Sequence, residues 1–402
     1  MVKILHTADI HLGAQFVALG ERADEYRQQL KKTFVKVIDL ALSEKVGLVL
    51  IAGDLFDSNF PAASTISLVK EQFKRLKEKN IQVAILPGTH DCLDDNSIYW
   101  REVFGSNVYV FKKPGARVYG DLDLMLWAKP NTAHQSTQSP LNFSRILDPR
   151  VKSKILCGAH VSEDDKKSNP EDDKLGVAKQ TKYSIALAHG SVIELAAKVD
   201  DQQYPLHLSE ITNSQFDYVA LGHWHSLRKP EEFNNKACYP GSPEPLALTQ
   251  SGAGYVALIN LDDGLEIKLV KVGSKEFDKI VIDLGLLESE EQVKKAVLKG
   301  ATDNLIRQVE FKGLRPASLN IDLEILVKEL SDSFFRLVLT DNSQIVADQF
   351  DPSQFPQELI IGQFARLMQE RLQKAKDERE KNIIQQAVQM GIAALQKGEF
   401  QF

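Results

Sequence analysis

Short apolar runs alternate with amphipathic stretches along the first part of the chain. The runs at residues 3–8, 48–52 and 81–86 are rich in aliphatic side chains and are typical of buried strands. Between them, residues 24–43 and 62–79 repeat apolar positions every three to four residues, which predicts helices with one buried face. Because strand, helix and strand follow one another twice, we expect βαβ units and a parallel sheet.

The middle of the chain contains several shorter predicted strands. Short strand-like runs lie at residues 108–111, 122–127, 183–188 and 218–221, and a strand pair at 255–259 and 266–270 turns at Asp262-Asp263-Gly264. Residues 131–182 are polar and carry no clear pattern. Their acidic and lysine-rich part, residues 163–174, is typical of an exposed loop.

The pattern changes after the strand pair. Strand-like and helix-like pieces alternate between residues 276 and 345, at 279–283, 288–299, 305–312, 321–330 and 335–340, and they predict a small α+β unit without a motif of its own. Residues 356–398 have a helical pattern with two amphipathic stretches on either side of the charged residues 374–381. We therefore divide the chain into a core at 1–272, a smaller domain at 273–345 and a helical segment at 346–402.

Composition places the chain among globular proteins. Its 402 residues exceed one ordinary core, and 43% hydrophobic and 26% charged residues are typical of a soluble protein. The sequence enters an apolar strand directly after Met1, and no apolar run approaches the roughly 20 residues that span a bilayer, so we expect a cytoplasmic protein without a membrane contact. Cys92, Cys157 and Cys238 fit no zinc or redox spacing and are expected to be buried or idle thiols.

The net charge of -6 argues against a surface that is positively charged throughout for nucleic-acid binding. It does not exclude a local basic patch, and bound divalent cations would offset several carboxylates. Charge alone mildly favours a small substrate.

Candidate chemistry gathers where the predicted strands end. Five strand ends carry carboxylates or histidines: Asp9-Ile10-His11, Gly53 to Asp57, Pro87 to Asp91, His189, and Gly222 to His225. The carboxyl ends of parallel strands meet at one edge of a sheet, where open α/β folds bind ligands. A single Gly-Asp pair also makes an ordinary turn. Five such strand ends together predict a metal site.

These motifs resemble those of the calcineurin-like metallophosphoesterases, whose signature is D-x-H, G-D-x-x-D, G-N-H-D/E, a single histidine after a strand, and G-H-x-H. All five occur in order within residues 1 to 245. The resemblance implies an α/β fold, with a metallophosphoesterase α/β sandwich core followed by a smaller α+β capping domain and C-terminal helices. One position departs from the signature, because Thr89 stands where the family has asparagine.

A finer resemblance is to the SbcD type of DNA repair exonuclease, the nuclease subunit of the double-strand-break processing complex. It rests on Ile4 to Gly13, Asp217 to His223 and Tyr239 to Glu244. It implies a metal-dependent DNA exonuclease or endonuclease that forms a homodimer. It also implies a capping domain that helps admit DNA and C-terminal helices that bind an SMC-like ATPase, although such helices and such a domain also occur as ordinary packing modules.

Hydrolysis of a phosphodiester needs a hydroxide in line with the leaving oxygen and positive charge over the other oxygens, and two cations about 3.5 to 4 Å apart supply both. Asp54 is the candidate bridging carboxylate. By resemblance, Asp9, His11 and His225 complete the first metal position, and His189 and His223 the second. Thr89 replaces a second-metal ligand, so that position is weaker or is completed by water or the threonine hydroxyl.

The donors in this set are nitrogen and oxygen, which suits Mn²⁺ and, less decisively, Zn²⁺ or Fe²⁺; Mg²⁺ is a further alternative. The family resemblance favours manganese.

His90 has no metal role in this scheme, and we assign it the protonation of the leaving alkoxide or the stabilisation of charge on the phosphorus oxygens. Asp91 is expected to orient the ring of His90, and Asp57 to hold a metal ligand in place. His160 also ends an apolar run and is an alternative to His189. We prefer His189 because it follows a cleaner strand and lies closer to the final motif. We assign no function to the remaining histidines, His6, His134 and His207.

Two other functions stay open at this point. A phosphatase or cyclic-nucleotide phosphodiesterase acting on a small substrate would use the same metal core, although the roughly 150 residues beyond that core count against it. A non-catalytic interaction subunit would result if Thr89 left the second metal unbound, but the retention of His90 and the other candidate ligands argues otherwise.

Overall fold

The computed structural model describes residues 2–141, 181–196, 203–247, 250, 252–316, 319, 321–346 and 355–377, together with scattered positions between 380 and 395. His160, Cys157 and the acidic residues 163–174 lie outside this description. The chain divides into two compact units, Met1–Phe277 and Asp278–Phe402. The finer division with boundaries after residues 272 and 345 stays a prediction.

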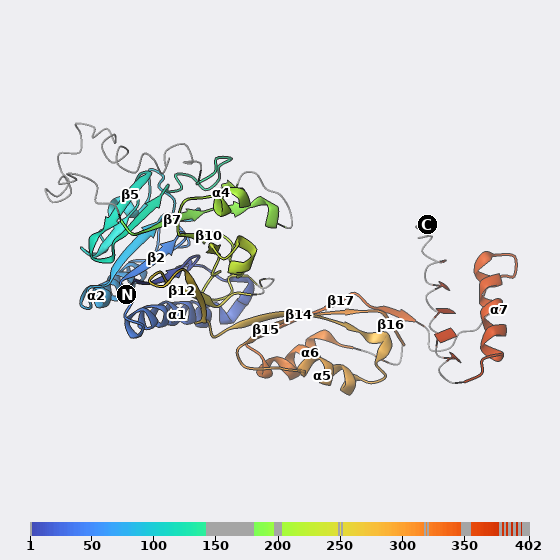
Figure 1. Ribbon diagram of the computed structural model, residues 1–402. Helices are drawn as coiled ribbons and strands as arrows, with labels where there is room; N and C mark the ends of the chain where they lie inside the picture. The colour runs from blue at the N-terminus through green and yellow to red at the C-terminus, as the bar shows by residue number, and fades with distance from the viewer. Residues whose placement is uncertain are drawn as a thin grey trace. The chain divides into compact units, whose positions relative to one another are not determined.

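The first sheet of unit 1 has six strands. Their spatial order is β13 (Glu266–Lys271), β12 (Tyr255–Asn260), β1 (Lys3–Thr7), β2 (Leu48–Ala52), β3 (Gln82–Leu86) and β4 (Val108–Val110). Strands β1 to β4 are parallel, whereas β12 pairs antiparallel with β1 and β13 with β12. Helices α1 (Ala23–Ser43) and α2 (Ala63–Lys77) join β1 to β2 and β2 to β3, which confirms the predicted βαβ units. Figure 1 labels two strands of this sheet, β2 and β12, together with helix α1.

The second sheet has five strands, in the order β11 (Ala237–Cys238), β10 (Tyr218–Gly222), β7 (Tyr183–His189), β6 (Leu124–Ala128) and β5 (Gly115–Tyr119). All neighbours are parallel except β5, which pairs antiparallel with β6. The sequence did not predict β5, because its side chains alternate between partly buried and exposed and so leave no apolar run. Shorter elements of this unit are α3 (Ile98–Arg101), β8 (Ser191–Val192), β9 (Pro205–Leu206) and α4 (Leu208–Thr212).

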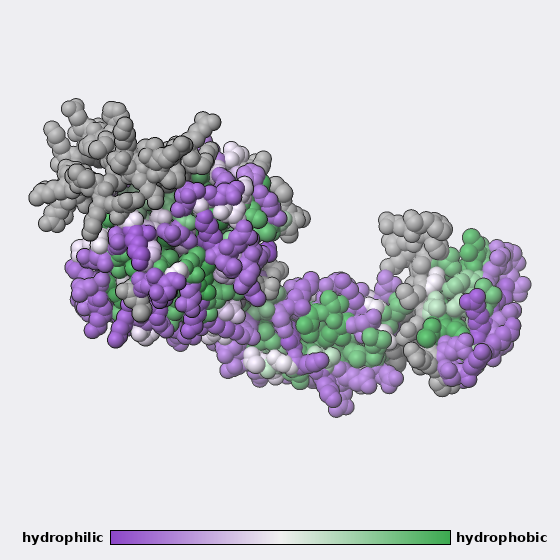
Figure 2. Space-filling view, in the orientation of Figure 1, coloured by the Kyte–Doolittle hydropathy of each residue, from purple (hydrophilic) through white to green (hydrophobic). Residues whose placement is uncertain are grey.

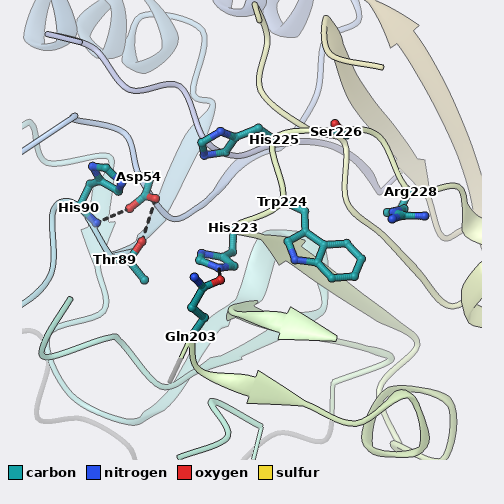
Figure 3. Close-up of a pocket in the computed structure, with 9 residues that line it drawn as sticks. All are labelled: Asp54, Thr89, His90, Gln203, His223, Trp224, His225, Ser226 and Arg228. Atoms are coloured by element: carbon teal, nitrogen blue, oxygen red, sulfur yellow. Dashed lines mark hydrogen bonds between the residues drawn. The ribbon is translucent and has the colours of Figure 1, made fainter. Parts of the chain in front are cut away.

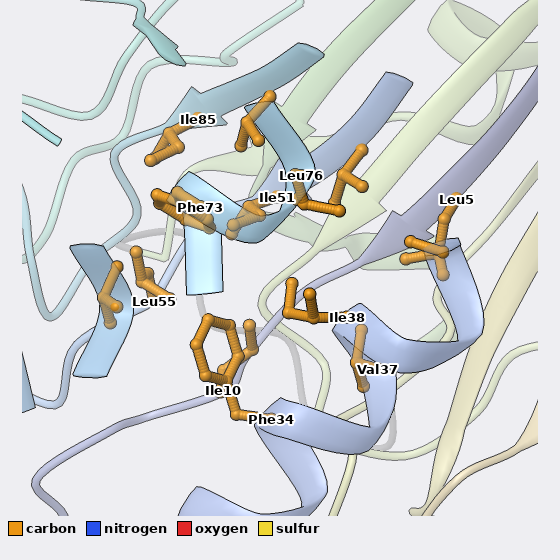
Figure 4. Packing of buried hydrophobic residues seen from close by; sticks show 14 of the residues in the cluster. Leu5, Ile10, Phe34, Val37, Ile38, Ile51, Leu55, Phe73, Leu76 and Ile85 are labelled. Carbon is orange, nitrogen blue, oxygen red and sulfur yellow. The ribbon is translucent and has the colours of Figure 1, made fainter. Parts of the chain in front are cut away.

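Strand β2 shows why the two sheets pack as a sandwich. Its five residues are all buried. Leu48, Leu50 and Ala52 face the second sheet in one apolar cluster, whereas Val49 and Ile51 belong to the cluster under α1 and α2. Successive side chains of a strand point to opposite faces, so a strand covered on both sides has to be apolar throughout. Figure 4 shows the helix side of this packing, with Phe34, Phe73 and Leu76 over the sheet.

Unit 2 has its own small core. A sheet of β14 (Glu276–Asp283), β15 (Leu305–Lys312) and β17 (Arg336–Asp341) packs with α5 (Glu290–Leu298) and α6 (Leu323–Leu330) around Val293, Phe311 and Leu326. Two short strands, β16 (Leu314–Pro316) and β18 (Gln344–Val346), pair beside it. Helix α7 (Ile360–Gln373) lies in the first of the two predicted C-terminal amphipathic stretches. Within the described part of the chain, no helix has both the length and the apolar character needed to cross a membrane.

Candidate metal centre

The candidate ligands follow the carboxyl ends of strands from both sheets. Asp9 and His11 follow β1, Asp54 follows β2, His189 ends β7 and His223 follows β10. Asp9, His11, Asp54 and His223 all have positive φ angles, of 53°, 50°, 52° and 108°. Backbones of this kind cost free energy for residues other than glycine and concentrate at functional sites.

The first group of ligand atoms consists of Asp9, His11 and His225. One potential ligand atom from each lies within 4.8 Å of the other two. His11 donates through Nδ1 to Asp57 Oδ1 at 3.0 Å, which leaves its Nε2 as the ligand atom. Asp57 thus lies on the far side of the His11 ring from Nε2, and its predicted role of holding this ligand in place stays a prediction.

The second group consists of Asp9, Asp54 and His189, again with ligand atoms within 4.8 Å of one another. His189 donates through Nδ1 to the carbonyl of Ala52 at 2.9 Å, so its Nε2 faces Asp54 Oδ2 at 3.2 Å. The same oxygen of Asp54 lies 3.5 Å from His11 Nε2. One oxygen of Asp54 thus lies near a histidine of each group, while Asp9 belongs to both groups.

Thr89 occupies the position of the family's asparagine. Its hydroxyl lies 3.2 Å from Asp54 Oδ2 and 3.4 Å from His189 Nε2. The Thr89 hydroxyl is therefore directed at the second group, and its oxygen stands where the family has the amide oxygen of asparagine.

His223 lies at the edge of this arrangement. Its backbone N–H donates to both carboxylate oxygens of Asp9, at 3.0 and 3.1 Å, and its Nε2 lies 3.2 Å from Gln203 Oε1. Its ring contacts that of His189 edge to face, with 5.2 Å between centroids. Gln203 was not predicted from the sequence, because it lies in a polar region 20 residues before its partner.

His90 and Asp91 differ in their surroundings. The ring of His90 lines the pocket, and its Nδ1 donates to the carbonyl of Asp57 at 3.1 Å. Asp91 is buried and accepts hydrogen bonds from Gly88 N, Phe56 N and the Tyr99 hydroxyl, at 2.8, 3.1 and 2.6 Å. This corrects the expectation that Asp91 orients the ring of His90: its carboxylate holds the loop backbone, and the backbone of Asp57 orients the ring.

Burial and neighbouring charges shift the pKa values of the ligands. Burial raises the pKa of Asp9 to about 7, against the opposing charge of His189. Burial alone would lower the pKa of His189, but the adjacent Asp54 carboxylate raises it to about 9. Burial lowers the pKa values of His223 and His225 to about 3, so both rings are neutral at pH 7 and carry a free lone pair.

These residues fit divalent metal ions. His11 Nε2 is buried and, among the described residues, has no hydrogen-bond partner. Two buried carboxylates and several imidazoles converge within a few ångströms, and burying ionised groups away from water is costly in a protein interior. Divalent cations satisfy both conditions, because they accept lone pairs from imidazole and keep buried carboxylates ionised.

The pocket in front of these ligands has a volume of about 410 Å³. Figure 3 shows its two sides, with Asp54, Thr89 and His90 on one and Trp224 and Arg228 on the other. The guanidinium of Arg228 lies 5.0 Å from the centre of the Trp224 ring, which stacks on Tyr239 at 4.9 Å. Arg228 could not be predicted from the sequence, since it belongs to none of the motifs.

Comparisons with known proteins find a matching family and several distant relatives. A family model described as calcineurin-like phosphoesterase matches residues 2–227. The uncharacterized metallophosphoesterase YhaO of Bacillus subtilis (strain 168) is 25% identical over 272 residues, which cover 65% of this chain and 57% of that protein. The DNA double-strand break repair protein Mre11 of Aeropyrum pernix is 28% identical over 291 residues, which cover 71% of this chain and 64% of that protein.

The chain thus spans less than two thirds of the length of either relative, 57% and 64%. Among solved structures, TT1561 of Thermus thermophilus is similar with a TM-score of 0.38 and 13% identity, over 67% of this chain and 99% of that one.

Proposed function

Because the chain belongs to the calcineurin-like phosphoesterase family of metal-dependent phosphoester hydrolases, we propose that its substrate is DNA and that it is an exonuclease or endonuclease of DNA repair. The observation that carries this proposal is Arg228, a cation in the same pocket as the metal ligands. It offers a contact for a second phosphate, which a nucleotide chain supplies and an isolated phosphomonoester does not. The likeness to Mre11 and the SbcD-type stretches support the same substrate class.

The residues of the site divide the work of phosphodiester cleavage. Asp9, His11 and His225 would hold one cation and Asp54 and His189 the other, with His223 and the Thr89 hydroxyl beside them. When bound, the cations supply a nucleophile at neutral pH and positive charge for the phosphate oxygens. His90 lines the same pocket with Nδ1 fixed by a backbone carbonyl, so its Nε2 is available to give a proton to the leaving oxygen.

We propose Mn²⁺ as the metal and two ions per chain. The nitrogen and oxygen donors and the convergence of two ligand groups on Asp9 and Asp54 support this choice. The neutral hydroxyl oxygen of Thr89 is less polarised than an amide oxygen and stands on a shorter stem, so the second ion is the weaker of the two.

The test is Mn²⁺-dependent degradation of end-labelled linear duplex DNA by the full chain. We expect degradation by the native protein and none by Asp54→Asn or His90→Ala. His207→Ala, at an exposed histidine, is the matched control and should remain active.

Two results would contradict the proposal. Cleavage of bis(p-nitrophenyl) phosphate without degradation of DNA would favour a phosphatase or phosphodiesterase that acts on a small substrate. Absence of both activities in the metal-loaded protein would favour a non-catalytic interaction subunit.

We also propose two protein partners, a second copy of the chain and an SMC-like ATPase bound through the C-terminal helices. Helix α7 and the residue before it expose Leu359, Ile360 and Leu367, and hydrophobic surface lies beside hydrophilic surface in this region (Figure 2). Light scattering of the purified chain would test the dimer, and a monomer at micromolar concentration would contradict it. We also propose the cytoplasm as the compartment, because a DNA repair enzyme has to reach DNA there.

A further inference from the structure

A cysteine, a carboxylate and a histidine meet beside the loop that carries His90. Potential ligand atoms of Cys92, Asp94 and His134 lie within 4.8 Å of one another, and the group shares no residue with the metal centre described above. We propose that these three residues form a separate metal site, here named the loop site, that takes a zinc ion.

The donor set is suited to zinc. Thiolate, imidazole and carboxylate are the three side-chain groups that bind Zn²⁺, and three protein ligands leave the fourth tetrahedral position for water. A soft thiolate also favours zinc over the manganese proposed for the main centre. The described residues at the main centre offer only imidazole nitrogens and oxygen atoms, so the two sites differ in chemistry.

Two of the three ligands of the loop site, His134 and Asp94, are already oriented by hydrogen bonds. His134 donates through Nδ1 to the carbonyl of Thr89 at 2.7 Å, which leaves the lone pair of its Nε2 free. Asp94 Oδ1 accepts from Asn59 Nδ2 at 3.0 Å and from the backbone of Asn96 at 2.9 Å. Hydrogen bonds of this kind behind the ligands are typical of protein metal sites, where they fix the tautomer and the direction of the ligand atom.

The two chain segments of the loop site are also held together without a metal. The N–H of Leu93 donates to the carbonyl of Asn131 at 2.8 Å, and Asn59 Nδ2 donates to the carbonyl of Cys92 at 2.9 Å. Cys92 and Asn59 are buried, so this part of the site does not have to form on binding. A zinc ion would tie residues 131–134 to the loop of residues 87–94, which carries Thr89 and His90.

Cobalt(II) tests the loop site, because it replaces zinc in tetrahedral sites and a thiolate ligand gives a sulfur-to-cobalt charge-transfer band in the near ultraviolet. We expect this band when the apoprotein is titrated with Co²⁺, and its loss when Zn²⁺ is added. Asp54→Asn should keep the band because Asp54 is not one of the three ligands of the loop site. Cys92→Ser should abolish it, whereas Cys238→Ala, at the other described cysteine, should not.

His134→Ala provides a second measurement that does not disturb the core, since His134 is exposed. The affinity of this variant for Co²⁺ at the loop site should fall by at least about tenfold. Even the loss of a residue that only hydrogen-bonds to a metal ligand lowers metal affinity by about that factor. Absence of the band in the native protein, or its persistence in Cys92→Ser, would overturn the proposal. Unchanged cobalt affinity in His134→Ala would overturn the ligand set.

Discussion

At the candidate centre, the ligand histidines present one nitrogen to the site because the other nitrogen is already bonded. His11 and His189 donate through Nδ1 to Asp57 and to the carbonyl of Ala52, and His223 pairs through Nε2 with Gln203. A carboxylate or carbonyl acceptor fixes the tautomer and therefore decides which lone pair can bind a metal. The contacts behind the ligands are thus as informative about the site as the ligands themselves.

Asp57 provides a direct test of this orientation. In Asp57→Ala the ring of His11 loses its acceptor, so the affinity for Mn²⁺ should fall by about 10- to 100-fold, the usual cost of losing such a partner. Asp57→Asn keeps an acceptor oxygen and should lose less. Isothermal titration calorimetry measures both, with Asp263→Ala, at an exposed carboxylate in a turn, as the control. Equal affinities in Asp57→Ala and the native chain would exclude this role.

Arg228 tests the substrate class. Removing its charge in Arg228→Ala should raise KM for DNA by about tenfold or more, because a hydrogen bond to a charged group contributes about 1.5–3 kcal/mol. Arg228→Lys keeps the charge but not the planar fork, so an intermediate KM is expected. Steady-state kinetics on a short DNA duplex measures KM and kcat separately. An unchanged KM with a reduced kcat would contradict a binding role.

His6 is a buried histidine outside the centre, and it links stability to pH. Burial lowers its pKa to about 3 from the ordinary 6.5, so between these values only the unfolded chain binds the proton. The free energy of unfolding therefore falls as the pH drops below about 6.5, by about 1.4 kcal/mol between pH 7.5 and 5.5 for this one group.

His6→Gln removes that contribution. Its free energy of unfolding in the presence of EDTA should change less between the two pH values than that of the native chain, by about 1.4 kcal/mol. Urea denaturation at pH 7.5 and 5.5 measures the difference. Equal pH dependence in the two proteins would mean that His6 is protonated in the folded chain.

At the scale of elements, the site depends on how closely β10 approaches β2. A Cβ atom on Gly222 would lie 1.8 Å from the carbonyl oxygen of Ala52 and 2.9 Å from Nδ1 of His189. The backbone of Ala52 cannot retreat, because it orients His189 and continues a buried strand. The glycine of this motif is therefore needed to bring the two sheets together at the ligands.

Gly222→Ala should accordingly lower the free energy of unfolding by about 3 kcal/mol or more, the upper end of the cost of overpacking. It should also displace His189 and weaken Mn²⁺ binding. Gly120→Ala is the matched control, because nothing lies within 4 Å of a Cβ built there. Thermal unfolding of the two variants makes the comparison, and equal midpoints would contradict the steric argument.

The elements that the sequence predicted share one property, an uninterrupted pattern of apolar positions along the element. Strand β2 is buried on both faces and α1 has one apolar stripe, so each is visible in a short window of sequence. Strand β5 alternates burial along an edge and β11 has two residues, and neither leaves such a pattern. The ligands could be found because they follow strand ends, whereas Gln203 and His134 have their partners 20 and 45 residues away.

At the scale of the whole molecule, the two units have separate hydrophobic cores. The three apolar clusters of unit 1 end at Val272, and the cluster of unit 2 begins with Ile280. All candidate metal ligands lie in unit 1. Because each unit buries its own apolar side chains, we expect unit 1 to fold and bind metal without unit 2.

A chain that ends at Phe277 tests what unit 2 contributes. It should cleave bis(p-nitrophenyl) phosphate with the same kcat/KM as the full chain, because this small substrate needs only the metal ligands and His90. The SbcD-type resemblance implies that unit 2 helps to admit DNA. If it does, kcat/KM of the shortened chain on duplex DNA should fall by at least about tenfold, which corresponds to about 1.4 kcal/mol of transition-state binding. Equal activity of both chains on DNA would instead make unit 2 a packing or dimerisation module. The DNA contacts would then lie within unit 1, and Arg228 would be the first of them to examine.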